Sequence, residues 1–281
     1  MLRVALPNKG SLSEGASALF REAGYRQRRT NRDLTCLDES NGIEFFYLRP
    51  GDIATYVASG DLDVGVTGRD LALNSGADVE EVLGLGFGRS TFRFAAAPGT
   101  AGSVKDLEGM RIASSYGGVV RSHLEDHDVS ASIVTLAGAV ENAIALGVAD
   151  AVADVVETGT TLRQAGLEVF GEPILKSEAV LISKAGNGEA DGHRQLLRRV
   201  KGVLVARTYV MLAYDVKAEL LERAVALTPG IESPTVSPLH SEGWVAVQAM
   251  CERKTIHTVM DDLYELGARG ILATDIGACR L

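Results

Sequence analysis

The sequence contains few cysteines, and they form no redox or metal motif. Its 281 residues include three, Cys36, Cys251 and Cys279, which lie far apart and contain no Cys-x-x-Cys pair. An odd, scattered set is typical of reduced thiols in a cytosolic protein, not of a disulfide framework or a zinc site. We expect all three to fill space in the core.

Long apolar runs and positive charge are also scarce. No segment reaches the ~18 consecutive apolar residues that a membrane helix requires. The apolar run near the N-terminus ends at Pro7 and Lys9, unlike a secretory signal, so we expect a cytoplasmic protein that binds no membrane. Lysine and arginine number 28 against 37 acidic residues, a net charge of -9. This balance argues against binding to nucleic acid, although a local pocket can still be basic.

Charged residues follow three predicted strands in the first part of the chain. The strands span residues 3–6, 43–48 and 63–67, and the loops after them carry Lys9, Arg49, and Arg69 with Asp70. Any one of these side chains could simply be solvated. Three such loops together predict a polar crevice at the carboxyl edge of a sheet.

A crossover into a second lobe is predicted near residue 90. Gly84, Gly86 and Gly88 precede a segment in which apolar and polar residues alternate. Further strands are expected at residues 111–113, 133–136, 151–155 and 179–183. We therefore assign residues 1–90 and 185–210 to lobe 1, and residues 91–184 to lobe 2.

The stretch from Asp150 to Leu162 is the most informative in lobe 2. An apolar strand runs into Asp154, and a Thr-Gly-Thr-Thr turn begins four residues later, directly after Glu157. The turn offers backbone N–H groups and three hydroxyls, and the acid could meet sugar hydroxyls, so the stretch suits a phosphorylated sugar. An ordinary capped helix start is the alternative, because threonine and acidic residues favour helix N-termini.

The last 70 or so residues show a different pattern of predicted strands and helices. Strand and helix patterns alternate over residues 211–281 in the order βαββαβ, which predicts a ferredoxin-like domain. Small domains of this kind often sense ligands, which is an argument by analogy.

Several blocks of the sequence carry a specific resemblance. Along its whole length, the chain resembles ATP phosphoribosyltransferase of the long, histidine-regulated form. This enzyme catalyses the first step of histidine biosynthesis. The blocks that carry this resemblance span residues 7–12, 48–53, 65–70, 150–162, 233–239 and 267–272. It implies a two-lobed α/β catalytic core like that of periplasmic binding proteins, with a ferredoxin-like regulatory domain.

The resemblance also implies a reaction. Adenine N1 of ATP would attack phosphoribosyl pyrophosphate, with Mg²⁺ holding the pyrophosphate that leaves. Histidine would inhibit the reaction, and the chain would form a dimer or hexamer. The phosphoribosyl pyrophosphate site would comprise Asp154, Glu157, Thr158, Gly159, Thr160 and Thr161. The ATP site would comprise Lys9, Arg49, Arg69, Asp70, Tyr116 and Glu141, with Lys9, Arg49 and Asp154 closest to the chemistry. The histidine site would comprise Asp215, Ser233 and Thr235.

Two other readings fit the same two-lobed pattern. One is a non-enzymatic receptor for small anions, such as a solute-binding protein or the sensor half of a regulator. The lack of a signal-like segment disfavours the exported receptor, and the acidic charge without a helix-turn-helix disfavours the DNA-binding regulator. The other is a sugar-phosphate enzyme of a different class.

Overall fold

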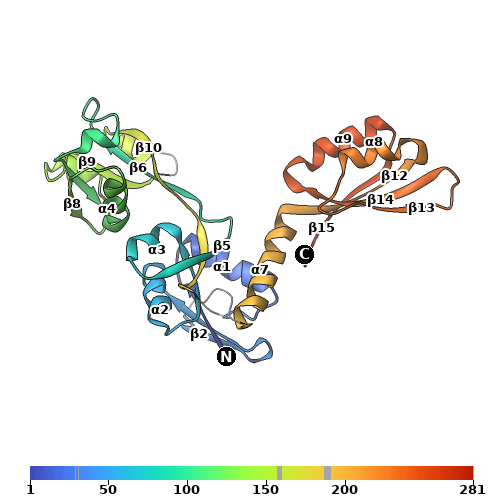
Figure 1. Cartoon of the computed structure of the whole chain (residues 1–281), viewed down its shortest axis with the longest axis horizontal. Coiled ribbons are helices and arrows are strands. Elements are labelled where there is room, and N and C mark those ends of the chain that lie inside the picture. Colours follow the sequence, from blue (N-terminus) through green and yellow to red (C-terminus); the bar gives the residue numbers. More distant parts are fainter. Residues whose placement is uncertain (29, 31, 157–159, 187–190, 281) are drawn as a thin grey trace. The chain divides into compact units, whose positions relative to one another are not determined.

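The computed structural model describes residues 1–28, 30, 32–156, 160–186 and 191–280. The chain forms two compact units. The first contains Met1–Ala18 and Tyr25–Arg194, and the second contains Leu19–Gly24 and Gln195–Leu281. Figure 1 labels the elements of both units. Among the described residues, no helix is long and apolar enough to cross a membrane.

Lobe 1 of the first unit is built on a six-stranded sheet. The strand order is β2 (Thr35–Asp38), β3 (Ile43–Leu48), β1 (Leu2–Pro7), β4 (Val64–Gly68), β11 (Ala179–Lys184) and β5 (Val79–Gly84). Its helices are α1 (Ser11–Glu22), α2 (Ile53–Ser59) and α3 (Arg69–Ser75). Three successive residues of β1, Val4, Ala5 and Leu6, are fully buried, as expected for a parallel strand covered on both faces.

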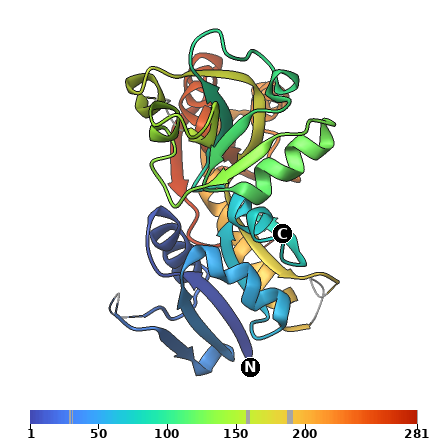
Figure 2. The same ribbon diagram turned by 90° about the vertical axis from the view of Figure 1, so that its left-hand side faces the viewer.

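The position of β11 corrects the predicted lobe boundary. We expected the strand over residues 179–183 to end lobe 2, but it pairs antiparallel with β4 and β5 of lobe 1. Figures 1 and 2 show this yellow strand among the blue and cyan strands of lobe 1. Five consecutive residues of β11 are buried, so the strand needs neighbours on both sides, and a position inside the lobe 1 sheet provides them.

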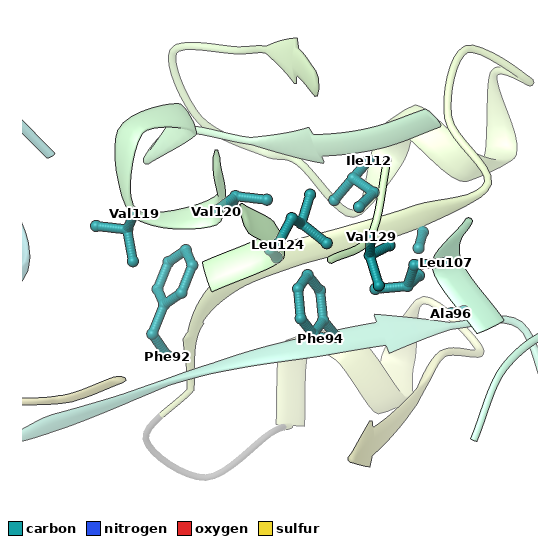
Figure 3. Packing of buried hydrophobic residues seen from close by; sticks show 11 residues of the cluster. Phe92, Phe94, Ala96, Leu107, Ile112, Val119, Val120, Leu124 and Val129 are labelled. Atoms are coloured by element: carbon teal, nitrogen blue, oxygen red, sulfur yellow. The ribbon is translucent and has the colours of Figure 1, made fainter. Parts of the chain in front are cut away.

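Lobe 2 is a five-stranded sheet with helices on both faces. The strand order is β10 (Glu168–Ser177), β6 (Ser90–Ala96), β9 (Ala151–Val156), β7 (Arg111–Ser114) and β8 (Ser132–Thr135). Its helices are α4 (Gly117–Asp126), α5 (Asn142–Ala145) and α6 (Thr160–Gln164). Figure 3 shows Phe92 and Phe94 of β6 facing Val120 and Leu124 of α4 in the core of one face. Val152 of β9 faces the opposite core, where Leu162 of α6 packs.

The second unit contains the predicted ferredoxin-like domain. Helix α7 (Asp191–Thr208) leads into strands β12 (Tyr209–Lys217), β13 (Thr235–Pro238), β14 (Trp244–Glu252) and β15 (Arg269–Asp275), with helices α8 (Leu221–Leu227) and α9 (Ile256–Leu266). The sheet order β13-β14-β12-β15 and the βαββαβ sequence confirm the prediction. Arg207 of α7 pairs with Glu22 at the end of α1, with Nε 2.7 Å from Oε2.

Five short 3₁₀ helices complete the described chain: Glu39–Asn41, Pro50–Asp52, Val104–Leu107, Ala218–Leu220 and Arg253–Thr255.

Candidate functional site

The carboxyl edge of the lobe 1 sheet holds the first group of predicted residues. Strands β1, β3 and β4 run parallel, so the loops after them emerge at the same edge. The Asn8 backbone N–H donates to the Leu48 carbonyl at 2.8 Å, which ties the loop of Lys9 to the loop of Arg49. Both side chains are exposed. The structure therefore presents two cations at one edge of the sheet.

Arg69 follows β4 at the same edge, but its charge is already paired. Its Nε and Nη2 lie 2.7 Å from the two carboxylate oxygens of Glu81, and Nη2 lies 3.2 Å from Oε1 of Glu178. Nη1 donates to the Lys176 carbonyl at 3.0 Å. Hydrogen bonding to Glu81 contributes most to raising the pKa of Arg69, and Arg69 in turn lowers the pKa of Glu81. These contacts hold the guanidinium against the segment that returns from lobe 2.

Asp70, next to Arg69, lies close to Tyr116 of lobe 2. The Asp70 side chain is buried, and its backbone N–H donates to Ser177 Oγ at 3.0 Å. The Tyr116 ring packs edge-on against Phe92, with ring centroids 5.3 Å apart. Burial, together with the charges of Asp70 and Asp154, raises the pKa of Tyr116 to about 12. The phenol therefore stays protonated at neutral pH and can donate a hydrogen bond.

Asp154 and Glu141 form the acidic part of the site in lobe 2. Asp154 lies on β9, and Glu141 comes just before α5. Burial raises the pKa of Asp154; its hydrogen bond from the Val155 N–H at 2.8 Å lowers the pKa, and the charge of Glu141 raises it further. A carboxyl whose pKa is raised by burial and by a neighbouring acid is a candidate for a functional site.

Four predicted residues thus lie near enough for their charges to affect one another. Asp70 from lobe 1 and Asp154 from lobe 2 both act on Tyr116, and Glu141 acts on Asp154. Beside them the lobes touch directly, because the Gly118 N–H donates to Asn74 Oδ1 at 2.9 Å. A Cβ on Gly118 would lie 2.7 Å from the Asn74 carbonyl oxygen, so this contact requires glycine.

The predicted phosphate loop is described only in part. Glu157, Thr158 and Gly159 lie outside the described residues. Thr160 and Thr161 begin α6, and both are exposed. Arg163 lies one turn further on, with Nη2 3.4 Å from Thr160 Oγ1, and brings a cation to this turn that the sequence interpretation did not assign.

A cavity of about 580 Å³ lies between the segments that connect the lobes. Among the predicted site residues, Arg69 lines this cavity. It is lined by Arg69, Arg89, Ser90, Thr91, Val156, Lys176, Ser177 and Glu178. The sequence interpretation missed Arg89 and Lys176, because only the pairing of β6 with β9 and β10 brings them together.

The predicted histidine-site residues lie on or beside the sheet of the second unit. Leu212, Tyr214 and Val216 of β12 point into the core with the helices, so Asp215 lies on the opposite face. Thr235 pairs with Gln248, which pairs with Ala213, and this register places Thr235 on the same face as Asp215. Ser233 is exposed just before β13.

The Asp215 carboxylate lies against a glycine of the neighbouring strand. A Cβ on Gly270 would be 3.3 Å from Asp215 Oδ2, and Gly270 has a φ of 60°. Glycine at position 270 therefore lets β15 pass close to the Asp215 carboxylate.

The fold defines a two-lobed α/β protein with an appended ferredoxin-like domain. A family model described as ATP phosphoribosyltransferase matches residues 49–202, and one described as HisG, C-terminal domain, matches residues 206–278. The chain belongs to the ATP phosphoribosyltransferase family, and the C-terminal match indicates its long form.

Relatives and a solved structure agree with this assignment. The ATP phosphoribosyltransferase of Streptomyces avermitilis is 62% identical over 285 residues, and that of Salinispora tropica is 63% identical over 281 residues, each over the whole of both chains. The ATP phosphoribosyl transferase (HisG:HisZ) complex from Thermotoga maritima matches with a TM-score of 0.62 at 24% identity, covering 73% of this chain and 98% of that chain. The likeness to the Thermotoga structure concerns the fold, and the predicted fold class is confirmed.

Proposed function

We propose that the chain transfers the phosphoribosyl group of phosphoribosyl pyrophosphate to N1 of the adenine of ATP, as the first step of histidine biosynthesis. Family membership gives the activity. One observation supports a reaction site around Asp154: the charges of Asp70, Asp154 and Glu141 and the phenol of Tyr116 affect one another within one unit. Two lobes contribute to it, as a reaction between two substrates requires.

The phosphoribosyl side of the site belongs to lobe 2. Asp154 accepts hydrogen bonds from the ribose hydroxyls, since its carboxylate is partly buried and, within the described part of the chain, accepts a hydrogen bond only from the Val155 N–H. Thr160 and Thr161, with Glu157, Thr158 and Gly159 before them, hold the 5′-phosphate through hydroxyl and N–H groups. The exposed hydroxyls of the first two are consistent with this role.

The ATP side belongs mainly to lobe 1. Lys9 and Arg49 attract phosphate charge at the carboxyl edge of the sheet, while Asp70, Tyr116 and Glu141 face the adenosine. Arg69 contributes through its place beside Asp70, because its own guanidinium is paired with Glu81 and Glu178.

The reaction requires positioning and charge stabilisation. The N1 lone pair forms a bond to the anomeric carbon as the carbon–oxygen bond to pyrophosphate breaks, and the electron pair leaves with pyrophosphate. N1 needs no strong base, because its lone pair is free in neutral adenine. The negative charge of Asp154, coupled to that of Glu141, stabilises positive charge that develops on the ribose ring. Lys9 and Arg49 stabilise the leaving group.

Mg²⁺ enters with the pyrophosphate in this proposal. The described residues hold no group of three or more histidine, cysteine or acidic side chains that could bind a metal ion. Mg²⁺ commonly binds through one or two carboxylates with substrate phosphates and water, and Asp154 and Glu141 fit that partial role. When bound, the ion neutralises charge on the leaving pyrophosphate.

Regulation is assigned to the second unit. Asp215, Ser233 and Thr235 would bind the amino and imidazole groups of histidine, supported by the shared sheet face of Asp215 and Thr235. The chain would assemble as a dimer or hexamer in the cytoplasm.

The direct test is to mix the full chain with ATP, phosphoribosyl pyrophosphate and Mg²⁺ and to measure pyrophosphate release and absorbance near the adenine band. We expect stoichiometric pyrophosphate and phosphoribosyl-ATP. Saturable binding of both ligands without pyrophosphate release would instead indicate the receptor.

A further inference from the structure

The pairing of Arg69 removes one of the three cations, Lys9, Arg49 and Arg69, that the sequence assigned to phosphate charge. Two carboxylates, Glu81 and Glu178, already contact this guanidinium at 2.7 and 3.2 Å. An arginine held in this way gives little further attraction to an anion, because its charge is balanced and its N–H groups are in use. Other cations near the site must therefore carry part of this role.

Two such cations line the cavity of about 580 Å³ between the lobe connections. The Arg89 side chain is 77% exposed, and its Nε is 3.9 Å from Glu178 Oε2, beyond hydrogen-bonding distance. Lys176 is exposed, and its ammonium has no carboxylate partner among the described residues. Both charges are therefore available to a ligand.

Strand register places this cavity at the end of β9. Thr91 of β6 lies between Val156 of β9 on one side and Lys176 of β10 on the other. In the sequence, Val156 comes directly before the predicted phosphoribosyl-binding residues. The hydroxyls of Ser90 and Thr91 line the same cavity and add hydrogen-bond donors.

We propose that Arg89 and Lys176 form a subsite for a polyphosphate chain, with Ser90 and Thr91 as neutral donors. The volume lies within the range of small-ligand pockets. Arginine binds phosphate through two parallel N–H groups, and lysine binds it as a point charge. The subsite rests on the proposed function, since either the pyrophosphate of phosphoribosyl pyrophosphate or the triphosphate of ATP supplies its ligand.

A second cavity in lobe 2 provides a contrast. Its volume is about 610 Å³ and it also contains an arginine, Arg121, but it is lined by the acids Glu108, Glu125 and Asp128. Three acids around one arginine repel a polyphosphate. Arg121→Gln is therefore a control, because it removes one cation from a cavity of similar size elsewhere in the same unit.

The test measures binding of inorganic pyrophosphate with Mg²⁺ to the full chain by titration calorimetry. We expect Arg89→Gln with Lys176→Gln to raise the Kd about tenfold or more, and R121Q to leave it unchanged. A double variant that binds pyrophosphate like the unsubstituted protein, with unchanged circular dichroism, overturns the subsite.

Initial rates identify the source of the phosphate chain. A raised KM for phosphoribosyl pyrophosphate alone assigns the subsite to its pyrophosphate, and a raised KM for ATP alone assigns it to the triphosphate. Unchanged values for both overturn the proposal. Absence of turnover in the unsubstituted protein would instead contradict the proposed function, so the two failures are distinct.

A measurement on the unsubstituted protein tests the subsite even if the double variant does not fold. Pyrophosphate with Mg²⁺ should protect the Lys176 amine from acylation about fivefold or more, while exposed Lys184, outside the cavity lining, reacts as before. Equal acylation of Lys176 with and without pyrophosphate overturns the subsite.

Discussion

The guanidinium Nη2 of Arg69 lies 3.2 Å from Oε1 of Glu178, and this ion pair joins the start of α3 to the segment that returns from lobe 2. The second carboxylate oxygen of Glu178 accepts the Gly86 N–H at 3.0 Å. A Cβ on Gly84 would lie 2.8 Å from Oε1, so a larger residue there would displace the carboxylate. One side chain thus links both connections between the lobes.

Glu178→Gln should weaken this link. The amide keeps the size of the side chain but loses the charge that faces Arg69, and we expect unfolding by urea to become easier by about 1 kcal/mol. The KM for both substrates should rise, because the two halves of the site lie on different lobes. Glu172→Gln, at an exposed position of β10, is the control. If E178Q and E172Q have the same stability and the same KM values, the charge of Glu178 does not link the two lobes.

Asp154→Asn should stabilise the fold while removing activity. The folded pKa of Asp154 is raised by burial and by Glu141, so the folded state binds this proton more tightly than the unfolded state does. Stability from this group is therefore present at low pH and is lost as the pH rises from about 4 through the folded pKa.

The pH dependence of the melting temperature measures this effect. D154N should melt about 2 °C above the unsubstituted protein at pH 7, and the difference should shrink toward pH 3.5. An equal or lower melting temperature for D154N at pH 7 would mean that the Asp154 charge is not disfavoured in the folded state.

Thr161→Val tests the phosphate side of the site. Valine keeps the shape of threonine but removes an exposed hydroxyl at the start of α6. We expect the KM for phosphoribosyl pyrophosphate to rise about tenfold with little change in the KM for ATP. Thr100→Val, in an exposed loop of lobe 2, should change neither value. If T161V and T100V behave alike, Thr161 does not contact the phosphate.

Asp215→Asn tests the regulatory assignment in the full chain. The amide removes the charge that would meet a cationic group of histidine, so inhibition by histidine should weaken about tenfold or more while activity without histidine is retained. Asp261→Asn, at an exposed position of α9, is the control. Calorimetry that finds the same histidine affinity in D215N and D261N would place the histidine site elsewhere.

Local patterns predicted much of this molecule because they depend on short stretches of sequence. The alternating apolar residues of β12 and the amphipathic α9 sufficed for the C-terminal domain, whose sheet order follows. Strand ends followed by polar residues singled out Asp70 and Asp154, and the family resemblance added Tyr116, on which both carboxylates act. Each of these signals lies within about ten residues.

Pairing between distant segments could not be predicted in the same way. Strand β11 is as apolar as a lobe 2 strand would be, and only its hydrogen bonds to β4 and β5 assign it to lobe 1. From the sequence, Arg69 was expected to face phosphate charge. Its pairing with Glu178 could not be predicted, because the two residues are 109 positions apart. The cavity of Arg89 and Lys176 depends on the same return of the chain.

The cluster around Asp154 is proposed to perform phosphoribosyl transfer to ATP. The most direct measurement is mass-spectrometric detection of phosphoribosyl-ATP, together with pyrophosphate release, for the unsubstituted chain and for D154N under identical conditions. We predict product from the unsubstituted chain and at least a hundredfold slower formation by a folded D154N. Equal rates for the two proteins, or no product from the unsubstituted chain, would contradict the claim.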